Sequence, residues 1–236
     1  MRRLLSAVPS RDPLALTPEV DAPVDLAAEY AHPAEGGWLR ANFVTSADGA
    51  IRGPDGLSGS ISGPADKRIF GVLRQLADCV LVGAETARAE GYRPARLPIA
   101  VVSGSLHLDL SLPLFAEAEH RTLVLTSAAA PPDLVRAVAE HAEVIVCGDE
   151  RVDPTLAVAA LAERGHRRLL CEGGPSLLAQ LLASGVLDEL CLTTSPTLAG
   201  DGPHLFPQPL DALARLELAG LLEDDGFLFH RYLVRR

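Results

Sequence analysis

Several features that mark large classes of protein are absent from this sequence. Its only lysine is Lys67, its formal net charge is −10, and its arginines form no basic cluster. A general nucleic-acid-binding protein carries a basic face, so this class is excluded. No apolar run approaches the roughly 20 residues of a membrane-spanning helix, and the apolar stretch after Arg2 and Arg3 is too short for a secretory signal. We therefore expect a cytoplasmic protein with neither a membrane nor a nucleic acid as its partner.

Metal-binding patterns are also missing. No two cysteines have the C-x-x-C spacing, and each lies in an apolar run that predicts a strand: Cys79, Cys147, Cys171 and Cys191. Buried free thiols in a reducing compartment are the expected result. His141-Ala142-Glu143 matches the first half of the zinc deaminase signature, but the P-C-x-x-C half does not follow. We expect no metal site, and we expect His141 to end a helix and Glu143 to begin a strand.

The common nucleotide-binding and hydrolase signatures are absent as well. The sequence contains no G-x-G-x-x-G, no G-x-x-x-x-G-K-[ST] and no G-x-S-x-G; the segment 59–63 approaches the last of these, but Ile61 stands at its centre. A standard Rossmann enzyme, a P-loop NTPase and an α/β-hydrolase are therefore disfavoured.

What is present is an alternation of apolar runs and amphipathic stretches in a chain that is 48% hydrophobic. Strands are expected at 38–45, 79–83, 98–103, 121–126, 142–148 and 167–174, and helices at 64–77, 84–90, 131–141, 153–165 and 175–185. Continuous apolar strands separated by helices are typical of a parallel sheet that is covered on both faces. We predict a three-layer α/β fold with a mostly parallel sheet.

The two ends of the chain depart from this alternation. Residues 1–36 are rich in proline, alanine and acids, and we expect an N-terminal extension there, with one short helix after Thr17, before a domain at 37–236. Near the C-terminus, strand-like runs follow one another without a helix, and Asp224-Asp225-Gly226 predicts a tight turn between the last two. An antiparallel hairpin is expected to close one edge of the sheet. Asp55-Gly56 gives a second, weaker hairpin signal.

Two strands are expected to end on glycine at the carboxyl edge of the sheet, where open α/β sheets bind ligands. One ends in Glu172-Gly173-Gly174 and is followed by Pro175-Ser176, and the other ends in Val82-Gly83 and is followed by Ala84-Glu85-Thr86. The amides of Gly174, Ser176 and Leu177 would be unpaired at a helix start, which attracts phosphate, and Gly174 would leave room for a pyrophosphate. Plain loops remain the alternative. Glu172 either binds a donor on a ring or caps the helix.

The motifs in combination resemble a known family. S-x-D-G in "NFVTSADGAI", L-V-G-x-x-T in "CVLVGAETARAEGY" and E-G-G-P-x-L in "LLCEGGPSLLAQLL" occur in order between Trp38 and Val234. They are similar to the pyrimidine reductase family of riboflavin biosynthesis, the reductase half of the bifunctional deaminase–reductase. The resemblance implies a dihydrofolate-reductase-like fold.

The resemblance also implies an activity and a set of site residues. The family uses NADPH to reduce the ribosyl group of a 5-amino-6-(phosphoribosylamino)uracil-like substrate to ribityl. By position, the cofactor contacts are Val44, Thr45, Ser60, Gly83, Thr86, Glu90, Ser103, Ser105, Gly174, Pro175, Ser176 and Leu177, with Ser103 or Ser105 near the 2′-phosphate. The substrate contacts are Ser58, Arg74, Pro94 and Glu172. Glu172 is the catalytic candidate and would hold ring donors, Arg74 would hold a phosphate, and water would supply the proton.

The sequence departs from the family in two respects. It has no zinc deaminase module, so a stand-alone reductase is expected. Where the family has two acids and a proline followed by a basic residue, this chain has Glu90-Gly91-Tyr92-Arg93-Pro94. The alternatives are therefore reduction of a pterin such as dihydrofolate in the same pocket, or a non-catalytic nucleotide-binding protein.

The oligomeric state is a further expectation. The last strands carry long apolar runs at a predicted sheet edge, which favours pairing with a second copy in a two-fold homodimer. The alternative is that residues 1–36 cover this edge and leave a monomer.

Overall fold

The computed structural model describes residues 1–6, 23–200, 202–206, 208–210 and 212–235, and within them ten strands form one sheet. The strands are β1 (Arg2–Ser6), β2 (Trp38–Thr45), β3 (Cys79–Gly83), β4 (Ile99–Val102), β5 (Leu123–Thr126), β6 (Glu143–Val146), β7 (Arg168–Cys171), β8 (Glu189–Thr194), β9 (Arg215–Asp224) and β10 (Phe227–Arg235). The helices are α1 (Leu26–Glu29), α2 (Pro64–Leu76), α3 (Ala84–Ala89), α4 (Pro113–Ala116), α5 (Pro132–His141), α6 (Pro154–Glu163) and α7 (Pro175–Ala183), with a short 3₁₀ helix at Ser58–Ser60.

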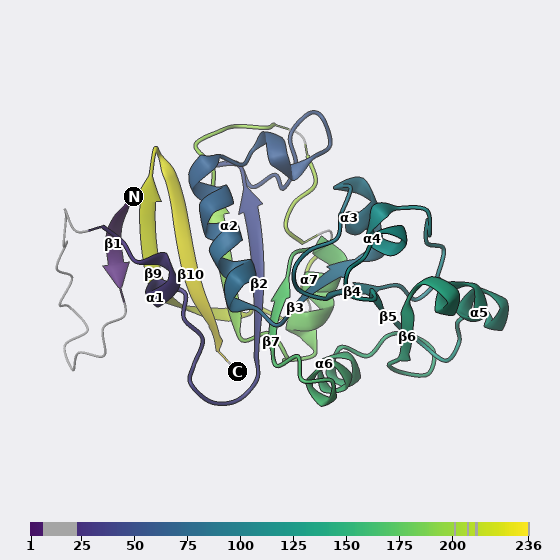
Figure 1. Cartoon of the computed structure of the whole chain (residues 1–236). Helices are drawn as coiled ribbons and strands as arrows, with labels where there is room; N and C mark the ends of the chain where they lie inside the picture. Colours follow the sequence, from purple (N-terminus) through teal and green to yellow (C-terminus); the bar gives the residue numbers. More distant parts are fainter. Residues whose placement is uncertain (7–22, 201, 207, 211, 236) are drawn as a thin grey trace.

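The sheet has the order β1-β9-β10-β8-β2-β7-β3-β4-β5-β6, and Figure 1 shows it crossing the molecule from β1 to β6. The strands from β8 to β6 in this order are parallel, whereas β10 pairs antiparallel with both β8 and β9. Asp225 and Gly226 both have positive φ, 52° and 81°, as a two-residue hairpin turn requires. The predicted α/β fold and its C-terminal hairpin are confirmed.

The predicted position of that hairpin at the sheet edge holds only in part. β10 lies inside the sheet, and β1 pairs with residues 220–223 of β9, whereas the structure describes no partner on the outer edge of residues 215–219. Residues from the N-terminal extension therefore cover part of the last hairpin. The strand was missed because a five-residue segment without alternation gives no local signal and is fixed by its distant partner. Thr17 lies outside the described residues, and the boundary at residue 36 stays a prediction.

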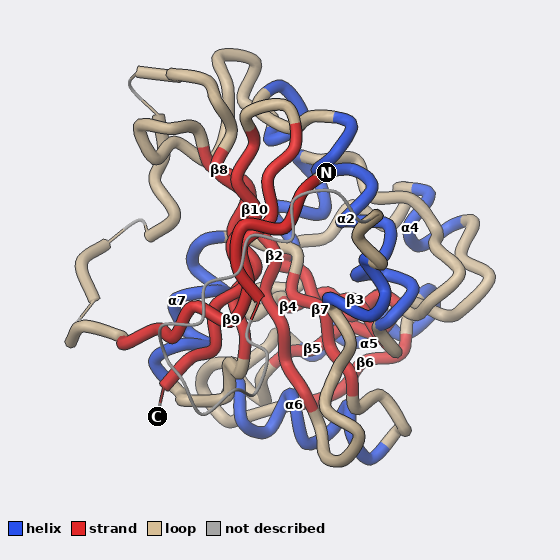
Figure 2. Tube along the Cα trace, turned by 90° about the vertical axis from the view of Figure 1, so that its left-hand side faces the viewer, coloured by secondary structure: helices blue, strands red, loops and turns tan. Residues whose placement is uncertain are grey.

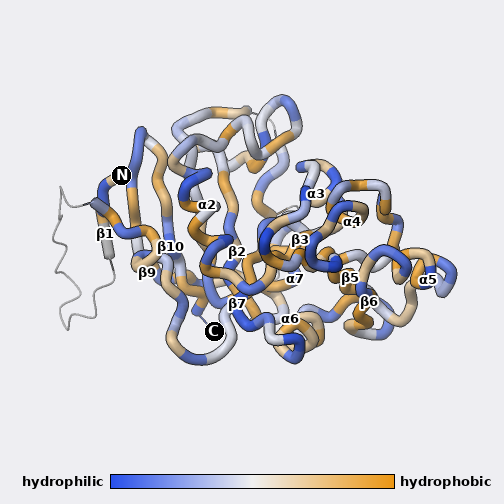
Figure 3. The backbone as a smooth tube through the Cα atoms, in the orientation of Figure 1, coloured by the Kyte–Doolittle hydropathy of each residue, from blue (hydrophilic) through white to orange (hydrophobic). Residues whose placement is uncertain are grey.

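Helices cover the sheet on both faces, as Figure 2 shows. On one face α6 and α7 pack against the sheet, and Leu161, Leu178 and Leu181 of these two helices belong to the apolar cluster that they share with the strands. The opposite face carries two separate apolar clusters. One lies under α3, α4 and α5, and the other lies under α2, where Leu73 meets Leu170 and Phe229. In Figure 3 the central strands β3, β4 and β5 are mainly hydrophobic, consistent with burial on both faces.

β2 lies between the two helix layers, and its side chains point alternately to one layer and to the other. Leu39, Ala41 and Phe43 belong to the α6–α7 cluster. Because successive side chains of a strand point to opposite faces, the even-numbered residues of β2 face α2. There Arg40 is buried, whereas Asn42 and Val44 line a cleft between α2 and α3.

A buried ionic cluster closes the amino-terminal edge of the parallel strands. Glu189 at the start of β8 accepts hydrogen bonds from Arg40 Nε at 2.9 Å, from Arg231 Nε at 2.8 Å and from Trp38 Nε1 at 2.8 Å. Burial by itself raises the pKa of Glu189, but Arg40 and Arg231 outweigh it and hold that pKa below its ordinary value. The cluster joins β2, β8 and β10; Arg40 and Glu189 are buried, and Arg231 is 20% exposed.

Several smaller expectations can be compared with the structure. The four cysteines are buried and free, and His141 ends α5 while Glu143 begins β6, as predicted. The hairpin predicted at Asp55-Gly56 does not form. A local turn closes there through Gly53 N and Leu57 O at 3.1 Å, because this glycine-rich segment has no apolar alternation to bury as strands. None of the described helices combines the length and apolar character needed to cross a membrane.

Candidate active site

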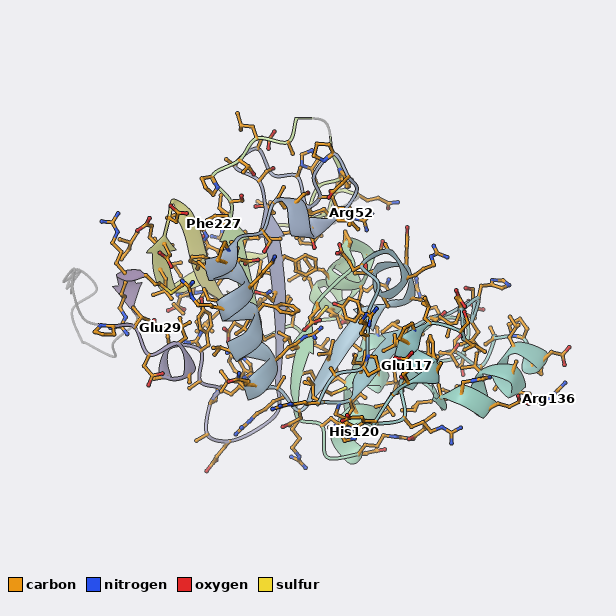
Figure 4. The ribbon with its side chains drawn as sticks, turned by 45° about the horizontal axis from the view of Figure 1, so that its top comes forward. Glu29, Arg52, Glu117, His120, Arg136 and Phe227 are labelled. Carbon is orange, nitrogen blue, oxygen red and sulfur yellow. The ribbon has the colours of Figure 1, made fainter. Side chains whose placement is uncertain are left out.

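Two adjoining clefts open at the carboxyl edge of the parallel strands. The β4-side cleft, of about 540 Å³, lies among the ends of β3 and β4 and the start of α7. The α2-side cleft, of about 440 Å³, lies among α2, the end of β2 and the segment that follows α3. Arg52, Thr86, Gly174 and Pro175 line both, and Figure 4 labels Arg52 on the loop that follows β2. Two ligands bound in these clefts would therefore meet at the two glycine junctions.

The glycine junctions after β3 and β7 are in direct contact. Gly83 N donates to Gly173 O at 2.8 Å, and the peptide bond between Gly173 and Gly174 is cis. An ideal Cβ at Gly174 would lie 2.6 Å from Thr86 Oγ1. The expectation that Gly174 leaves room for a pyrophosphate is therefore corrected. Its missing side chain allows Thr86 of α3 to approach, and this close approach joins the two junctions.

Helix α7 presents an uncapped N-terminus to the β4-side cleft. Gly174 is its N-cap residue and offers no side-chain hydrogen bond, whereas the Asp153 carboxylate caps α6 by accepting from the Thr155 and Leu156 amides. Ser176 and Leu177 line the cleft, and their amides belong to the first helical turn, which has no intrahelical acceptor. These donors and the helix dipole make the start of α7 suitable for an anion such as a pyrophosphate.

The far part of the β4-side cleft combines hydroxyl groups with positive charge. Ser103 and Ser105 both line it; Ser103 Oγ accepts from Leu106 N at 3.1 Å. Three further cleft residues were missed in the sequence analysis: Arg88, His107 and Arg151. Arg151 was detectable in principle, because it follows β6 at the same carboxyl edge. Arg88 and Arg151 supply positive charge that can hold a phosphate, and they do so beside two acids of the same cleft, Glu85 and Asp109.

Most residues predicted from the resemblance line one of the two clefts. The α2-side cleft contains Val44, Ser58, Arg74, Glu90, Pro94 and Glu172, and the β4-side cleft contains Gly83, Ser103, Ser105, Ser176 and Leu177. Ser58 and Glu90 are joined directly, since Ser58 N donates to Glu90 Oε1 at 3.1 Å. This contact ties the loop after β2 to the end of α3.

Two predicted residues, Thr45 and Ser60, line neither cleft. Thr45 neighbours Val44 on a strand and so points to the opposite face. Ser60 Oγ donates within its own exposed loop, to Asp55 Oδ1 at 2.8 Å. Their assignment as cofactor contacts finds no support in this geometry.

Glu172 lies at the wall of the α2-side cleft within a closed hydrogen-bonded cluster. Its two oxygens accept from Arg74 Nε and Nη2, each at 2.7 Å, and Oε2 also accepts from the Tyr92 hydroxyl at 2.7 Å. The Arg74 guanidinium lies 4.5 Å from the centre of the Phe70 ring. Burial and the neighbouring Glu172 carboxylate raise the pKa of Tyr92 well above its ordinary value. Arg74, expected to hold a phosphate, is thus paired with Glu172.

A second carboxylate of this cleft was missed in the sequence analysis. Asp66 on α2 is nearly buried and accepts from Ser62 Oγ at 2.6 Å and from Thr193 Oγ1 at 2.7 Å. Its neighbour Lys67 is exposed and lines the same cleft. Helical periodicity in the sequence predicted only the apolar face of α2. Asp66 and Lys67 in its first turn become candidate substrate-binding residues only because the fold places this turn beside β8 and the cleft.

Comparison with known families matches residues 37–226 to the family described as the RibD C-terminal domain. The chain belongs to the RibD C-terminal domain family. The resemblance to pyrimidine reductases inferred from the motifs is thereby confirmed.

Individual members of the family can be compared in more detail. A 2,5-diamino-6-ribosylamino-4(3H)-pyrimidinone 5′-phosphate reductase of Methanothermobacter thermautotrophicus is 32% identical over 168 residues, covering 67% of this chain and 77% of the relative. The enzyme of the same name from Archaeoglobus fulgidus is 32% identical over 181 residues, covering 69% of this chain and 82% of the relative. The crystal structure of a pyrimidine reductase-like protein from Corynebacterium diphtheriae has a TM-score of 0.75 and 31% identity, covering 85% of this chain and 92% of the other.

Proposed function

We propose that this protein is an NADPH-dependent reductase that converts the ribosyl group of a ribosylaminopyrimidine 5′-phosphate to ribityl. The observation that carries the proposal is the junction at Thr86, Gly174 and Pro175, where two clefts of different character adjoin. One suits an extended anionic nucleotide and the other a smaller polar ring, so the geometry supports transfer between two bound molecules. The named archaeal relatives support the pyrimidine substrate over the pterin alternative.

The β4-side cleft fits a dinucleotide cofactor in three respects. The start of α7 offers uncapped amides for the pyrophosphate, and Arg88 and Arg151 add positive charge. Val44 lines the adjoining α2-side cleft, where the nicotinamide end of the cofactor would meet the substrate. When bound, NADPH supplies the hydride, and the protein places the two rings side by side. The two arginines and Ser103 favour NADPH over NADH, because a 2′-phosphate gains charge-assisted contacts that a hydroxyl lacks.

The α2-side cleft fits a phosphorylated, ring-containing substrate. Arg52, Lys67 and Arg93 line it and can attract a sugar phosphate, while Phe70 and Tyr92 provide aromatic walls. The carboxylates of Asp66 and Glu172 already accept hydrogen bonds from protein groups.

Oxidation of NADPH, followed by its absorbance, tests the proposal. We expect turnover with 2,5-diamino-6-ribosylamino-4(3H)-pyrimidinone 5′-phosphate or its uracil counterpart, and none with dihydrofolate. Turnover with dihydrofolate alone would instead establish a pterin reductase. Tight NADPH binding without turnover of any of these would leave a nucleotide-binding protein. A comparison of NADPH with NADH at saturating substrate measures the cofactor preference.

We also propose a two-fold homodimer in the cytoplasm. β9 exposes Leu216 and Leu218, at 40% and 39%, and β1 pairs only with its residues 220–223. A second copy packed face to face would bury them. Buried free cysteines fit a reducing compartment. Light scattering at micromolar concentration decides the assembly, because the chain has a mass of 24.9 kDa and a dimer twice that value.

A further inference from the structure

Glu172 has little surface to offer a substrate. Its side chain is only 2% exposed, and its oxygens already accept from three donors of Arg74 and Tyr92. A ring N–H that enters the α2-side cleft therefore finds no exposed acceptor on Glu172 while this cluster is intact. Two possibilities remain for binding the ring N–H. Either Arg74 or Tyr92 moves away and exposes a Glu172 oxygen, or another atom of the Glu172–Arg74–Tyr92 cluster accepts the hydrogen bond.

Displacing Tyr92 is disfavoured by its packing. Tyr92 N donates to Ala87 O at 2.9 Å, which fixes the backbone against the end of α3. The ring packs on the apolar cluster beneath α3, α4 and α5, and the Arg74 guanidinium lies 5.7 Å from its centre on the other side. Moving the ring would expose apolar surface and break the hydroxyl bond to Glu172.

The hydroxyl of Tyr92 has its hydrogen directed at Glu172, which determines what the cleft receives. An O–H group that donates to a carboxylate keeps its oxygen lone pairs for another partner. Tyr92 lines the α2-side cleft and its hydroxyl lies 2.7 Å from Glu172, so those lone pairs are an acceptor beside Glu172 at the wall of the cleft. The carboxylate behind the hydroxyl polarises it and strengthens it as an acceptor.

We propose that Tyr92 Oη is the acceptor for a ring N–H of the substrate, and that Glu172 is a positioning residue which acts through Tyr92 and Arg74. The ring-bearing substrate class rests on the proposed function. Tyr92 thereby becomes a specificity-determining residue of this chain, located in the segment Glu90-Gly91-Tyr92-Arg93-Pro94 where it departs from the pattern of its family. A ligand whose ring lacks an N–H donor gains nothing from this acceptor.

Binding of 5,6-diaminouracil, measured by isothermal titration calorimetry, tests this without requiring turnover. We expect Tyr92→Phe to bind the base about three- to tenfold more weakly than the wild type, the effect of one lost hydrogen bond. Tyr232→Phe on β10, which lines neither cleft, is the matched control and should bind as the wild type does. Tyr232→Phe should keep the wild-type melting temperature, and Tyr92→Phe should lower it only modestly, because Glu172 keeps both hydrogen bonds from Arg74. Equal or tighter binding by Tyr92→Phe would show that Tyr92 only covers Glu172, and a wild type that does not bind the base would also overturn the proposal.

A double-mutant cycle tests the positioning role of Glu172. If Glu172 acts through Tyr92, Glu172→Gln should weaken binding of the base, and the pair Tyr92→Phe with Glu172→Gln should bind no more weakly than Tyr92→Phe alone. Additive losses would mean that Glu172 contacts the ring itself and would contradict the proposal. In the NADPH assay, Glu172→Gln should raise KM for the substrate with kcat nearly unchanged. A wild type that binds the base but oxidises no NADPH would refute the proposed function and leave this inference standing.

Discussion

Glu189 and Glu172 are two buried carboxylates at opposite edges of the parallel strands. Glu189 begins β8, is completely buried, and pairs with Arg40, which is 1% exposed, and with Arg231, which is 20% exposed. Glu172 follows β7, is buried almost as fully, and pairs with Arg74, which is 27% exposed and lines the α2-side cleft. Burial of the acid alone therefore does not separate a structural ion pair from a site residue. The position of its partner does, because Arg74 lines the α2-side cleft, whereas Arg40 and Arg231 line neither of the two clefts.

The difference follows from where each acid lies relative to the sheet. At the amino edge, Trp38, Arg40 and Arg231 converge on Glu189, and none of these residues lines either cleft. At the carboxyl edge, the apolar clusters under α2 and under α3 to α5 separate, and the gap between them becomes a cleft. Substitutions at the closed edge should change stability, whereas those at the open edge should mainly change binding and turnover.

The largest expected effect is on stability, at the closed edge. Glu189→Gln removes the charge that neutralises Arg40 and Arg231, and we expect it to lower the free energy of unfolding by about 3–5 kcal/mol. Urea unfolding measures the change. The matched variant Glu172→Gln should cost less, because Arg74 can regain water. An equal loss in the two variants would contradict the distinction between the two edges.

The next effect concerns the glycine junction at the open edge. In Gly174→Val the new side chain collides with Thr86, so we expect a loss of about 1–3 kcal/mol in stability from overpacking. NADPH binding, followed by fluorescence titration, should weaken more than tenfold because the two junctions separate. Gly71→Ala on α2, where nothing lies within 4 Å of an added Cβ, is the control and should leave binding unchanged. Normal NADPH affinity in Gly174→Val would remove the role assigned to the junction.

A third prediction concerns Glu172→Gln itself. We expect it to lower the free energy of unfolding by only about 1–2 kcal/mol, since it weakens charge-assisted bonds without leaving a fully buried arginine. Its activity should fall through KM, as measured by initial rates over a range of substrate concentrations. If Glu172→Gln lost stability but kept the wild-type kcat and KM, Glu172 would only stabilise the fold, as Glu189 does.

The smallest effect returns to the closed edge and depends on pH. Burial, followed by the charge of Arg40, lowers the pKa of His32 from 6.5 to about 4, and both of its ring nitrogens are buried without a partner. Because the folded state resists protonation, this histidine reduces stability as the pH falls from about 6.5 towards 4. His32→Leu should therefore lose less stability than the wild type across that window, measured by urea unfolding at several pH values. His107→Leu, at an exposed position, is the control, and its stability should change with pH as that of the wild type does. If His32→Leu lost as much stability as the wild type between pH 6.5 and 4, His32 would not cause the pH dependence.

The sequence predicted the parallel core because its signals are local. Apolar runs of strand length, amphipathic helices and the glycine junctions after β3 and β7 each depend on neighbouring residues. The cofactor contacts inferred around Gly174 were accessible for the same reason, since a motif fixes the course of the backbone. Even the turn at Asp225 and Gly226 needs only its own residue types.

Other features could not be predicted, because they join residues that are distant in the chain. Thr45 and Ser60 were assigned to the cofactor by position, yet the face of β2 and the hydrogen bonds of one loop exclude them from both clefts. Arg88 comes from α3 and Arg151 from the segment that follows β6, so no single motif contains them. Pairing between β1 and β9 likewise depends on a partner more than 200 residues away.

The sequence by itself therefore determined the order of the elements, the parallel core, the family and the glycine-rich edge at which ligands would bind, because each is encoded in local spacing. Only the tertiary structure decided what the acids and arginines do. Glu189 accepts hydrogen bonds from Arg40 and Arg231, and Glu172 accepts them from Arg74 and Tyr92. A charge takes its role from the partners and the solvent around it, and packing brings those partners together from distant parts of the chain.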